Sequence, residues 1–253
     1  VLNADAGAFP VFAGAVRSHG LGLMTVGAMG QGLNLSARTA EPGGQTRRIK
    51  AWGRPYTVAL PLVGAFQTSN ALVAAGLAIA AGEPVEEVLG ALEHLEGAPG
   101  RLQRVGAGPR GGEAFVDFAH TPDGLAVVLA ALRPHAAGRL IVVFGAGGDR
   151  DKGKRPLMGA IAADLADIAI VTDDNPRSEA PEAIRAAIRD GGGNLTEVAG
   201  RGEAIAAAAR LLEAGDILVV AGKGHEQGQE IAGVIHPFDD VAATRAALGL
   251  AND

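Results

Sequence analysis

The sequence contains no cysteine, and aromatic side chains make up only 4% of its 253 residues. The absence of cysteine excludes disulfide bonds and thiolate catalysis, and it favours a cytoplasmic location. Long apolar runs are lacking as well. The Ala-rich run at 71–81 is shorter than the roughly 18 residues that a membrane span needs, so we expect no membrane insertion.

Basic residues are outnumbered, with 22 Lys and Arg against 28 Asp and Glu, and the formal net charge is -6. A surface of this sign does not attract nucleic acid, and we expect no nucleic-acid partner. The hydrophobic fraction of 48% together with 38 Gly is typical of an α/β protein long enough for one large or two ordinary domains. The chain begins at Val1, inside a predicted strand and without an initiator Met, so we expect it to start in the middle of a larger protein.

The first 97 residues predict short strands and two helices. Alternating apolar and polar positions at 31–60 indicate hairpin-like antiparallel strands. Small and apolar residues at 67–81 favour a buried helix, and Pro84 opens a second helix whose apolar spacing continues to Leu95. The stretch from Gly97 to Gly100 is the best domain boundary, which predicts domains at 1–97 and 98–253.

After this boundary, strands and helices alternate. Apolar runs occur at 114–118, 140–144, 168–172 and 217–221, with a weaker one at 195–199, and each precedes a turn and an amphipathic segment. This pattern predicts an α/β fold with a doubly wound, mostly parallel sheet, in which ligands bind at the carboxyl ends of the strands. The polar residues at the predicted strand ends form four groups: Asp117 and His120; Asp149 and Arg150; Asp173 to Arg177; Lys223 to Glu226. We therefore expect one shared site.

The loop at 145–155 has nearly the spacing of a phosphate-binding loop, with Gly148 followed by Gly153 and Lys154. Arg155, however, occupies the position where that motif needs Ser or Thr for magnesium. Asp149 and Asp151 would also repel phosphate from the backbone amides. The loop is better suited to a zwitterionic substrate.

Three further stretches carry polar residues that invite two interpretations. In FVDFAHTPDGL, helix capping explains Thr121, whereas Asp117 and His120 favour a ligand role, since a strand-end carboxylate can accept the hydroxyls of a ribose. In TDDNPRSEAPEAI, Arg177 can grip a carboxylate while a nearby acid meets an ammonium, although a solvated loop is the alternative. In AGKGHEQGQEI, the glycines allow close approach to a ligand beside Glu226, although a plain turn is possible; no metal motif is present.

Two positions nearer the start are ambiguous on spacing alone. Asn70 in FQTSN either caps the buried helix or contacts a purine. Arg101, at the domain boundary, is either a surface charge or a phosphate contact.

Six stretches, in order along the chain, resemble the Mur ligase family: LVGAFQTSN, GAPGR, VDFAHTPDGL, VFGAGGDRDKGKRPLMGAIA, VTDDNPRSE and VVAGKGHEQGQEI. They cover about residues 58–231, and VLNAD at the start is more weakly similar. The resemblance implies that residues 1–97 are the C-terminal portion of the family's central ATP-binding domain. Residues 98–253 would then be the whole C-terminal domain, which binds the incoming amino acid.

The resemblance also implies an activity. An ATP- and Mg²⁺-dependent ligase of peptidoglycan precursor synthesis would phosphorylate the carboxylate of a UDP-muramoyl dipeptide, and the amine of meso-diaminopimelate would then attack it. These small molecules are the implied partners, and we expect a monomer. The implied contacts to meso-diaminopimelate are Arg150, Asp174, Asn175, Pro176, Arg177, Gly222 and Glu226. The implied nucleotide contacts are Asn70, Arg101, Asp117 and His120, with no metal ligand and no catalytic residue in this chain.

The sequence departs from the family pattern by lacking a GTNGKT-type phosphate loop, a UDP-binding N-terminal domain and the family's carbamylated lysine. We therefore expect the chain alone to bind ligands weakly at best and to turn nothing over. Two alternatives stay open. One is another Mur or folylpolyglutamate-type ligase that takes a different amino acid, such as lysine or ornithine. The other is an amino-acid-binding module without catalysis.

Overall fold

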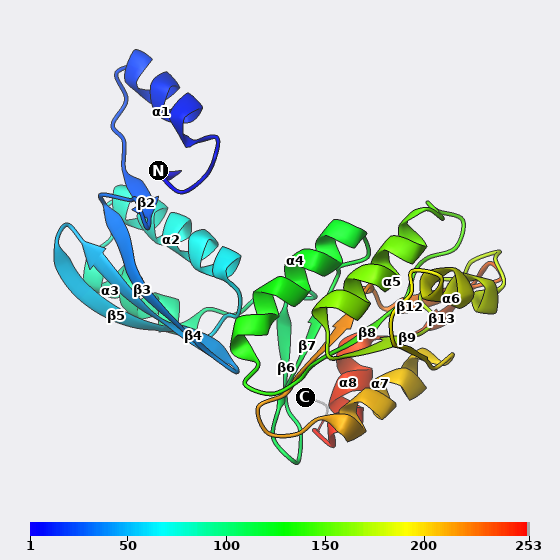
Figure 1. Cartoon of the computed structure of the whole chain (residues 1–253). Coiled ribbons are helices and arrows are strands. Elements are labelled where there is room, and N and C mark those ends of the chain that lie inside the picture. Colours follow the sequence, from blue (N-terminus) through cyan, green and yellow to red (C-terminus); the bar gives the residue numbers. More distant parts are fainter. Residues whose placement is uncertain (252–253) are drawn as a thin grey trace. The chain divides into compact units, whose positions relative to one another are not determined.

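The computed structural model describes residues 1–251, which fold into two compact units (Figure 1). The first unit spans Val1–Glu96, and the second begins at Gly97. The domain boundary predicted from the sequence lies within one residue of this division. No helix among the described residues is long and apolar enough to cross a membrane.

The first unit is built on a five-stranded sheet in the order β1-β2-β3-β4-β5. Its elements are β1 (Leu2–Asn3), α1 (Phe9–Ser18), β2 (Thr25–Gly27), β3 (Leu33–Glu41), β4 (Gly44–Ala51), β5 (Arg54–Leu60), α2 (Ala65–Ala80) and α3 (Val85–Ala91). Strands β1 to β3 pair in parallel, whereas β3, β4 and β5 form the antiparallel hairpins expected at 31–60. The helix after Pro84 is shorter than predicted, because it ends at Ala91 and tightens into a 3₁₀ turn over Leu92–His94.

The second unit is built on a six-stranded sheet in the order β10-β9-β8-β11-β7-β6. Its strands are β6 (Gln103–Ala107), β7 (Glu113–Asp117), β8 (Leu140–Phe144), β9 (Ile168–Val171), β10 (Leu195–Glu197) and β11 (Ile217–Ala221). Its helices are α4 (Pro122–Leu132), α5 (Lys154–Leu165), α6 (Pro181–Arg189), α7 (Arg201–Leu211) and α8 (Asp240–Leu248). A separate hairpin joins β12 (Gly228–Ile231) to β13 (Val234–Pro237).

Helices cover both faces of this sheet, with α4, α5 and α6 on one face and α7 and α8 on the other (Figure 1). Every residue of β8 and β11 is buried as a result, which explains their uninterrupted apolar sequences. All neighbouring strands are parallel except β6 and β7. The predicted doubly wound, mostly parallel sheet is therefore confirmed. Sequence patterning missed antiparallel β6 and the β12–β13 hairpin, because their strands have only four or five residues each.

Beside β11, neighbouring strands of the sheet are followed by helices on opposite faces. Strand β8 continues into α5 on one face of the sheet, whereas its neighbour β11 leads toward α8 on the other face. The register places Ala221 opposite Asp117 and Val220 opposite Val143, so the central strands end nearly level. The connections diverge here and leave a crevice above the carboxyl ends, where α/β sheets bind their ligands.

Candidate functional site

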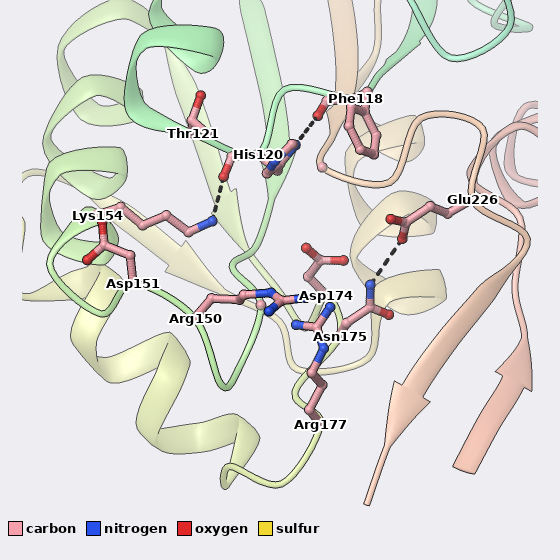
Figure 2. Close-up of a pocket in the computed structure, with 12 residues that line it drawn as sticks. Phe118, His120, Thr121, Arg150, Asp151, Lys154, Asp174, Asn175, Arg177 and Glu226 are labelled. Atoms are coloured by element: carbon pink, nitrogen blue, oxygen red, sulfur yellow. Dashed lines mark hydrogen bonds between the residues drawn. The ribbon is translucent and has the colours of Figure 1, made fainter. Parts of the chain in front are cut away.

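A cavity of about 410 Å³ opens at this crevice, within the second unit (Figure 2). Its lining residues are Phe118, His120, Thr121, Gly147, Arg150, Asp151, Lys154, Asp174, Asn175, Arg177, Gly222 and Glu226. They come from the loops that follow β7, β8, β9 and β11, the four strand ends that carry charged groups in the sequence. The charged loops that the sequence predicts to lie together therefore line one cavity.

The loop between β8 and α5 is held in place by hydrogen bonds that involve acidic side chains and a buried arginine. Arg155, at the position where a phosphate loop has Ser or Thr, donates from Nη2 to Glu179 Oε1 at 2.8 Å and is buried. This hydrogen bond, with the N–H of Asp149, lowers the pKa of Glu179 to about 2. Asp149 itself has φ +53° and accepts from Ser178 Oγ at 2.7 Å. Arg155 and Asp149 thus have local structural roles, and the loop is held against the β9–α6 loop.

Gly147 and Gly148 let these two loops touch. A Cβ on Gly148 would lie 1.9 Å from the carbonyl oxygen of Pro176, and one on Gly147 would lie 2.8 Å from Nη1 of Arg177. Arg177 Nη1 donates to the carbonyl of Gly148 at 2.8 Å, so its guanidinium rests on this glycine segment. Arg177 has the left-handed φ of +52°, a conformation that a side chain adopts only where its surroundings enforce it.

Asp174 is the most unusual group of the site. It is 6% exposed, and its Oδ1 has no hydrogen-bond partner among residues 1–251, although Lys223 Nζ lies 3.6 Å away. A buried carboxylate oxygen without a partner lowers stability, so a native protein usually retains one for a ligand or for catalysis.

Lys223 is fully buried behind the cavity. Its Nζ donates to Asn175 Oδ1 at 3.0 Å and to Glu226 Oε2 at 3.1 Å. Asn175 also donates from Nδ2 to Glu226 Oε2 at 3.0 Å, drawn as a dashed line in Figure 2. This network joins the loops after β9 and β11 and fixes the orientation of the Asn175 amide and the Glu226 carboxylate.

Two basic residues approach the cavity, Arg150 from the β8–α5 loop and Lys154 from the first position of α5. The Arg150 side chain points toward Asp174 and Arg177 in Figure 2, and its guanidinium has no ion-pair or hydrogen-bond partner in the described part of the chain. Lys154 Nζ donates to the carbonyl oxygen of His120 at 2.7 Å. Burial lowers the pKa of Lys154, although the carboxylate of Asp174 partly opposes this. The cavity thus holds cationic and anionic groups close together.

The predicted nucleotide contacts are not all in this cavity. His120 lines it, whereas Asp117 is buried and accepts the N–H groups of Leu102 at 2.7 Å and Ala119 at 2.8 Å. Burial raises the pKa of the Asp117 carboxyl, and these two N–H groups partly oppose the rise. Arg101 is exposed, with its guanidinium 4.8 Å from the centre of the Phe118 ring. Asn70 is exposed on α2 of the first unit.

Sequence reasoning missed several lining residues, including Lys154, Thr121 and Gly147. Lys154 was visible only as part of a failed phosphate-loop pattern, and Thr121 only as the cap of α4, whose Oγ1 accepts from Gly124 N at 3.2 Å. Neither pattern indicates which way a side chain faces. Nowhere among the described residues do three or more His, Asp or Glu side chains gather as a metal site.

Comparisons with known proteins identify the domain that carries this cavity. Residues 100–224 match the family model described as "Mur ligase, glutamate ligase domain". The chain belongs to the Mur ligase family. Most of the residues that line the cavity of this Mur ligase chain lie inside the matched range, and Glu226 lies just beyond it.

Relatives narrow the position within the family. This Mur ligase chain is 65% identical, over 98% of its length, to the UDP-N-acetylmuramoyl-L-alanyl-D-glutamate--2,6-diaminopimelate ligase of Caulobacter vibrioides, and covers 51% of that protein. The ligase of the same name from Mesorhizobium japonicum is 53% identical over 92% of the chain, which covers 48% of it. A solved structure of a ligase of this name superimposes with a TM-score of 0.78 at 37% identity, covering 98% of this chain and 52% of that one. The chain thus spans about half the length of these relatives.

Proposed function

We propose that this chain is part of an ATP-dependent ligase that adds meso-diaminopimelate to UDP-N-acetylmuramoyl-L-alanyl-D-glutamate in peptidoglycan precursor synthesis. One observation carries the proposal: Arg150 and Arg177 share a single cavity with a buried carboxylate oxygen of Asp174 that accepts no hydrogen bond from the described residues. The names of the similar proteins support the same substrate.

The two guanidiniums suit a carboxylate. Arg177 donates from Nη1 to the carbonyl of Gly148 and forms an ion pair with Glu230 beside Nε, which leaves Nη2 available, and Arg150 has no partner among the described residues. Planar guanidinium groups bind carboxylates through paired N–H donors. We assign the distal carboxylate of the amino acid to this pair.

The acids suit the ammonium on the same carbon. Asp174 Oδ1 lacks a hydrogen bond, and Glu226 lines the cavity while Lys223 and Asn175 hold one of its oxygens. Gly222 lines the cavity with its backbone, and its φ of +126° is a conformation that residues with a side chain rarely adopt. Asn175 and Pro176 act in this scheme by shaping the loop, because the amide of Asn175 is already engaged by Lys223 and Glu226.

This arrangement selects for a second carboxylate. L-Lysine carries an ammonium but no carboxylate at its distal end, so it would leave Arg150 and Arg177 without an anion in a site shaped around one. A site built for a polar group rejects an analogue without it by about 10⁴-fold. The amino acid is therefore oriented with its distal end fixed and its other amine free to attack an activated carboxylate.

For the nucleotide we propose Asn70, Arg101, Asp117 and His120. Asp117 fits a ribose hydroxyl in principle, because each of its oxygens accepts one N–H and retains a second lone pair. Phosphorylation of the dipeptide by ATP is the chemistry that the nucleotide supplies. Among the described residues, no three His, Asp or Glu side chains gather as ligands for Mg²⁺. We further propose that residues 1–97 belong to the ATP-binding domain.

The test is phosphate release by a hybrid ligase, in which residues 1–253 are joined to the part of the Caulobacter vibrioides relative that they do not match. ATP, Mg²⁺ and the UDP-muramoyl dipeptide are supplied with either meso-diaminopimelate or L-lysine, and the intact relative is assayed beside it. Turnover with diaminopimelate alone supports the proposal. Turnover with lysine would show that Arg177 does not discriminate between diaminopimelate and lysine. Binding of diaminopimelate by the chain without turnover by an otherwise folded hybrid favours a binding module.

A further inference from the structure

The β12–β13 hairpin contacts the cavity loop at a residue outside the charged strand-end groups. The backbone N–H of Glu230 donates to Asn175 Oδ1 at 3.0 Å, and its carboxylate Oε2 lies 3.2 Å from Arg177 Nε. The backbones are joined as well: Arg177 N donates to the Glu230 carbonyl at 3.0 Å, and Ala232 N donates to the Arg177 carbonyl at 2.7 Å. Glu230 therefore contacts two residues of the proposed substrate loop, yet it is not one of the cavity's lining residues in the described chain.

These contacts determine which edge of Arg177 is available. The Glu230 carboxylate is the ion-pair partner beside Nε, and the carbonyl of Gly148 accepts one N–H of Nη1, so Nη2 and the remaining N–H of Nη1 are left for a ligand. Because Arg177 has φ +52°, its backbone also depends on support from the hairpin. A long arginine side chain without the Glu230 contact would lose its fixed rotamer.

We propose that Glu230 is a positioning residue, which holds the Arg177 guanidinium so that its free Nη edge receives the distal carboxylate of the amino acid. This inference rests on the proposed function for the identity of that carboxylate. Two effects of removing Glu230 oppose each other: the positive potential at Arg177 rises, but the guanidinium loses its order. The Glu230 side chain is 39% exposed, so water screens its charge, and the loss of order dominates.

The first measurement uses the chain without ligand. An ordered Arg177 gives a sharp, slowly exchanging Nε–H signal in ¹H–¹⁵N NMR spectra, which Arg177→Lys assigns by removing it. Glu230→Ala should broaden this signal and speed its exchange, whereas Glu230→Gln, which fills the same space beside Nε, should preserve it. Glu182→Gln, an exposed carboxylate in the first turn of α6, is the charge-matched control and should leave the signal unchanged. An Nε–H signal that Glu230→Ala leaves unaltered overturns the inference, whatever the amino acid proves to be.

The second measurement compares meso-diaminopimelate with L-lysine by NMR titration of the same variants. Glu230→Ala should weaken diaminopimelate binding by about fivefold, the effect of freeing one long side chain, and leave lysine binding unchanged. Glu230→Gln should stay within about twofold of wild type, because positioning rather than charge is at issue. Equal weakening by both variants, or of both ligands, overturns the inference. If the wild type ignores diaminopimelate while the Nε–H signal still depends on Glu230, positioning stands and the substrate assignment fails.

Discussion

The two ends of the six-stranded sheet use charge in opposite ways. At the amino end, Asp216 is 3% exposed and fully engaged, accepting from Arg139 N at 2.7 Å, Arg139 Nη2 at 2.5 Å and Glu213 N at 3.0 Å. At the carboxyl end, Asp174 is almost as buried, yet one of its oxygens has no hydrogen bond in the described structure. Satisfied charges stabilise the fold, whereas the unsatisfied ones lower stability and are available for a ligand.

A third arrangement lies between these two. Arg201 and Asp240 form a fully buried ion pair at 2.6 Å between α7 and α8, and Arg201 also donates to the carbonyls of Ala221 at 3.1 Å and Asp173 at 3.3 Å. This pair touches the chain just where β11 ends and just after β9 ends. The ion pair supports the loops of the cavity without lining it. Fully paired, buried charges therefore occur next to the site as well as at the amino end of the sheet.

The largest expected effect comes from removing Arg177 at the carboxyl end. Arg177→Ala in the hybrid ligase should lower kcat/KM for meso-diaminopimelate by about 10³- to 10⁴-fold, because the distal carboxylate then enters a polar site without its main donor. The residual activity with L-lysine, about 10⁴-fold lower in the unsubstituted hybrid, should not fall further. Steady-state phosphate release measures both, and a loss below tenfold would contradict the role of Arg177 in selection.

The amino end should respond in stability instead. Asp216→Asn should lower the free energy of unfolding by about 2 kcal/mol, because the amide cannot accept all of the hydrogen bonds that the carboxylate accepts. Ligand binding should be unaffected. Arg150→Ala is the reciprocal variant, with unchanged stability and weaker binding of diaminopimelate. Urea unfolding measures the stability of both variants, and NMR titration measures their binding of diaminopimelate. A variant that changes both properties would contradict the separate roles of the two ends of the sheet.

A smaller effect is expected at Gly147, where a methyl group would displace the Arg177 guanidinium. The added Cβ lies 2.8 Å from Nη1, and the side chain has to move by a few tenths of an ångström. Gly147→Ala should weaken diaminopimelate binding by about tenfold, equivalent to 1.4 kcal/mol. Gly90→Ala is the matched control, because its Cβ meets nothing within 4 Å. Equal affinities in the two variants would show that Arg177 tolerates displacement.

The smallest effect concerns the pH dependence of the β8–α5 loop, residues 145–155. The hydrogen bond from Arg155 holds the pKa of Glu179 at about 2, below its ordinary value of 4.5. A depressed carboxyl pKa stabilises the folded state fully above the ordinary value, so this contribution should be lost as the pH falls from about 4.5 toward 2. Amide exchange in residues 145–155 should then accelerate over that range, and Glu179→Gln should remove the dependence. Titration of Glu179 near 4.5 by NMR would refute this.

Much of the site was predictable from the sequence because parallel strands bring their carboxyl ends together. The apolar runs located β7, β8, β9 and β11, and the charged residues after them were therefore expected in one place. The roles of Lys223 and Glu230 were not predictable in this way. Each acts by contacting Asn175, which is far away in the sequence, and Glu230 belongs to a hairpin whose four-residue strands are too short to give a strand pattern.

The sequence by itself determined the fold class, the strand ends that carry the site and the kinds of charge present there, since these follow from local composition and periodicity. The tertiary structure decided which of those charges are already paired. Arg155 and Asp149 are engaged by Glu179 and Ser178, whereas Arg150 and the Oδ1 atom of Asp174 have no such bond in the described chain. Hydrogen bonding depends on distance and direction within a few tenths of an ångström, and only the packed chain fixes these.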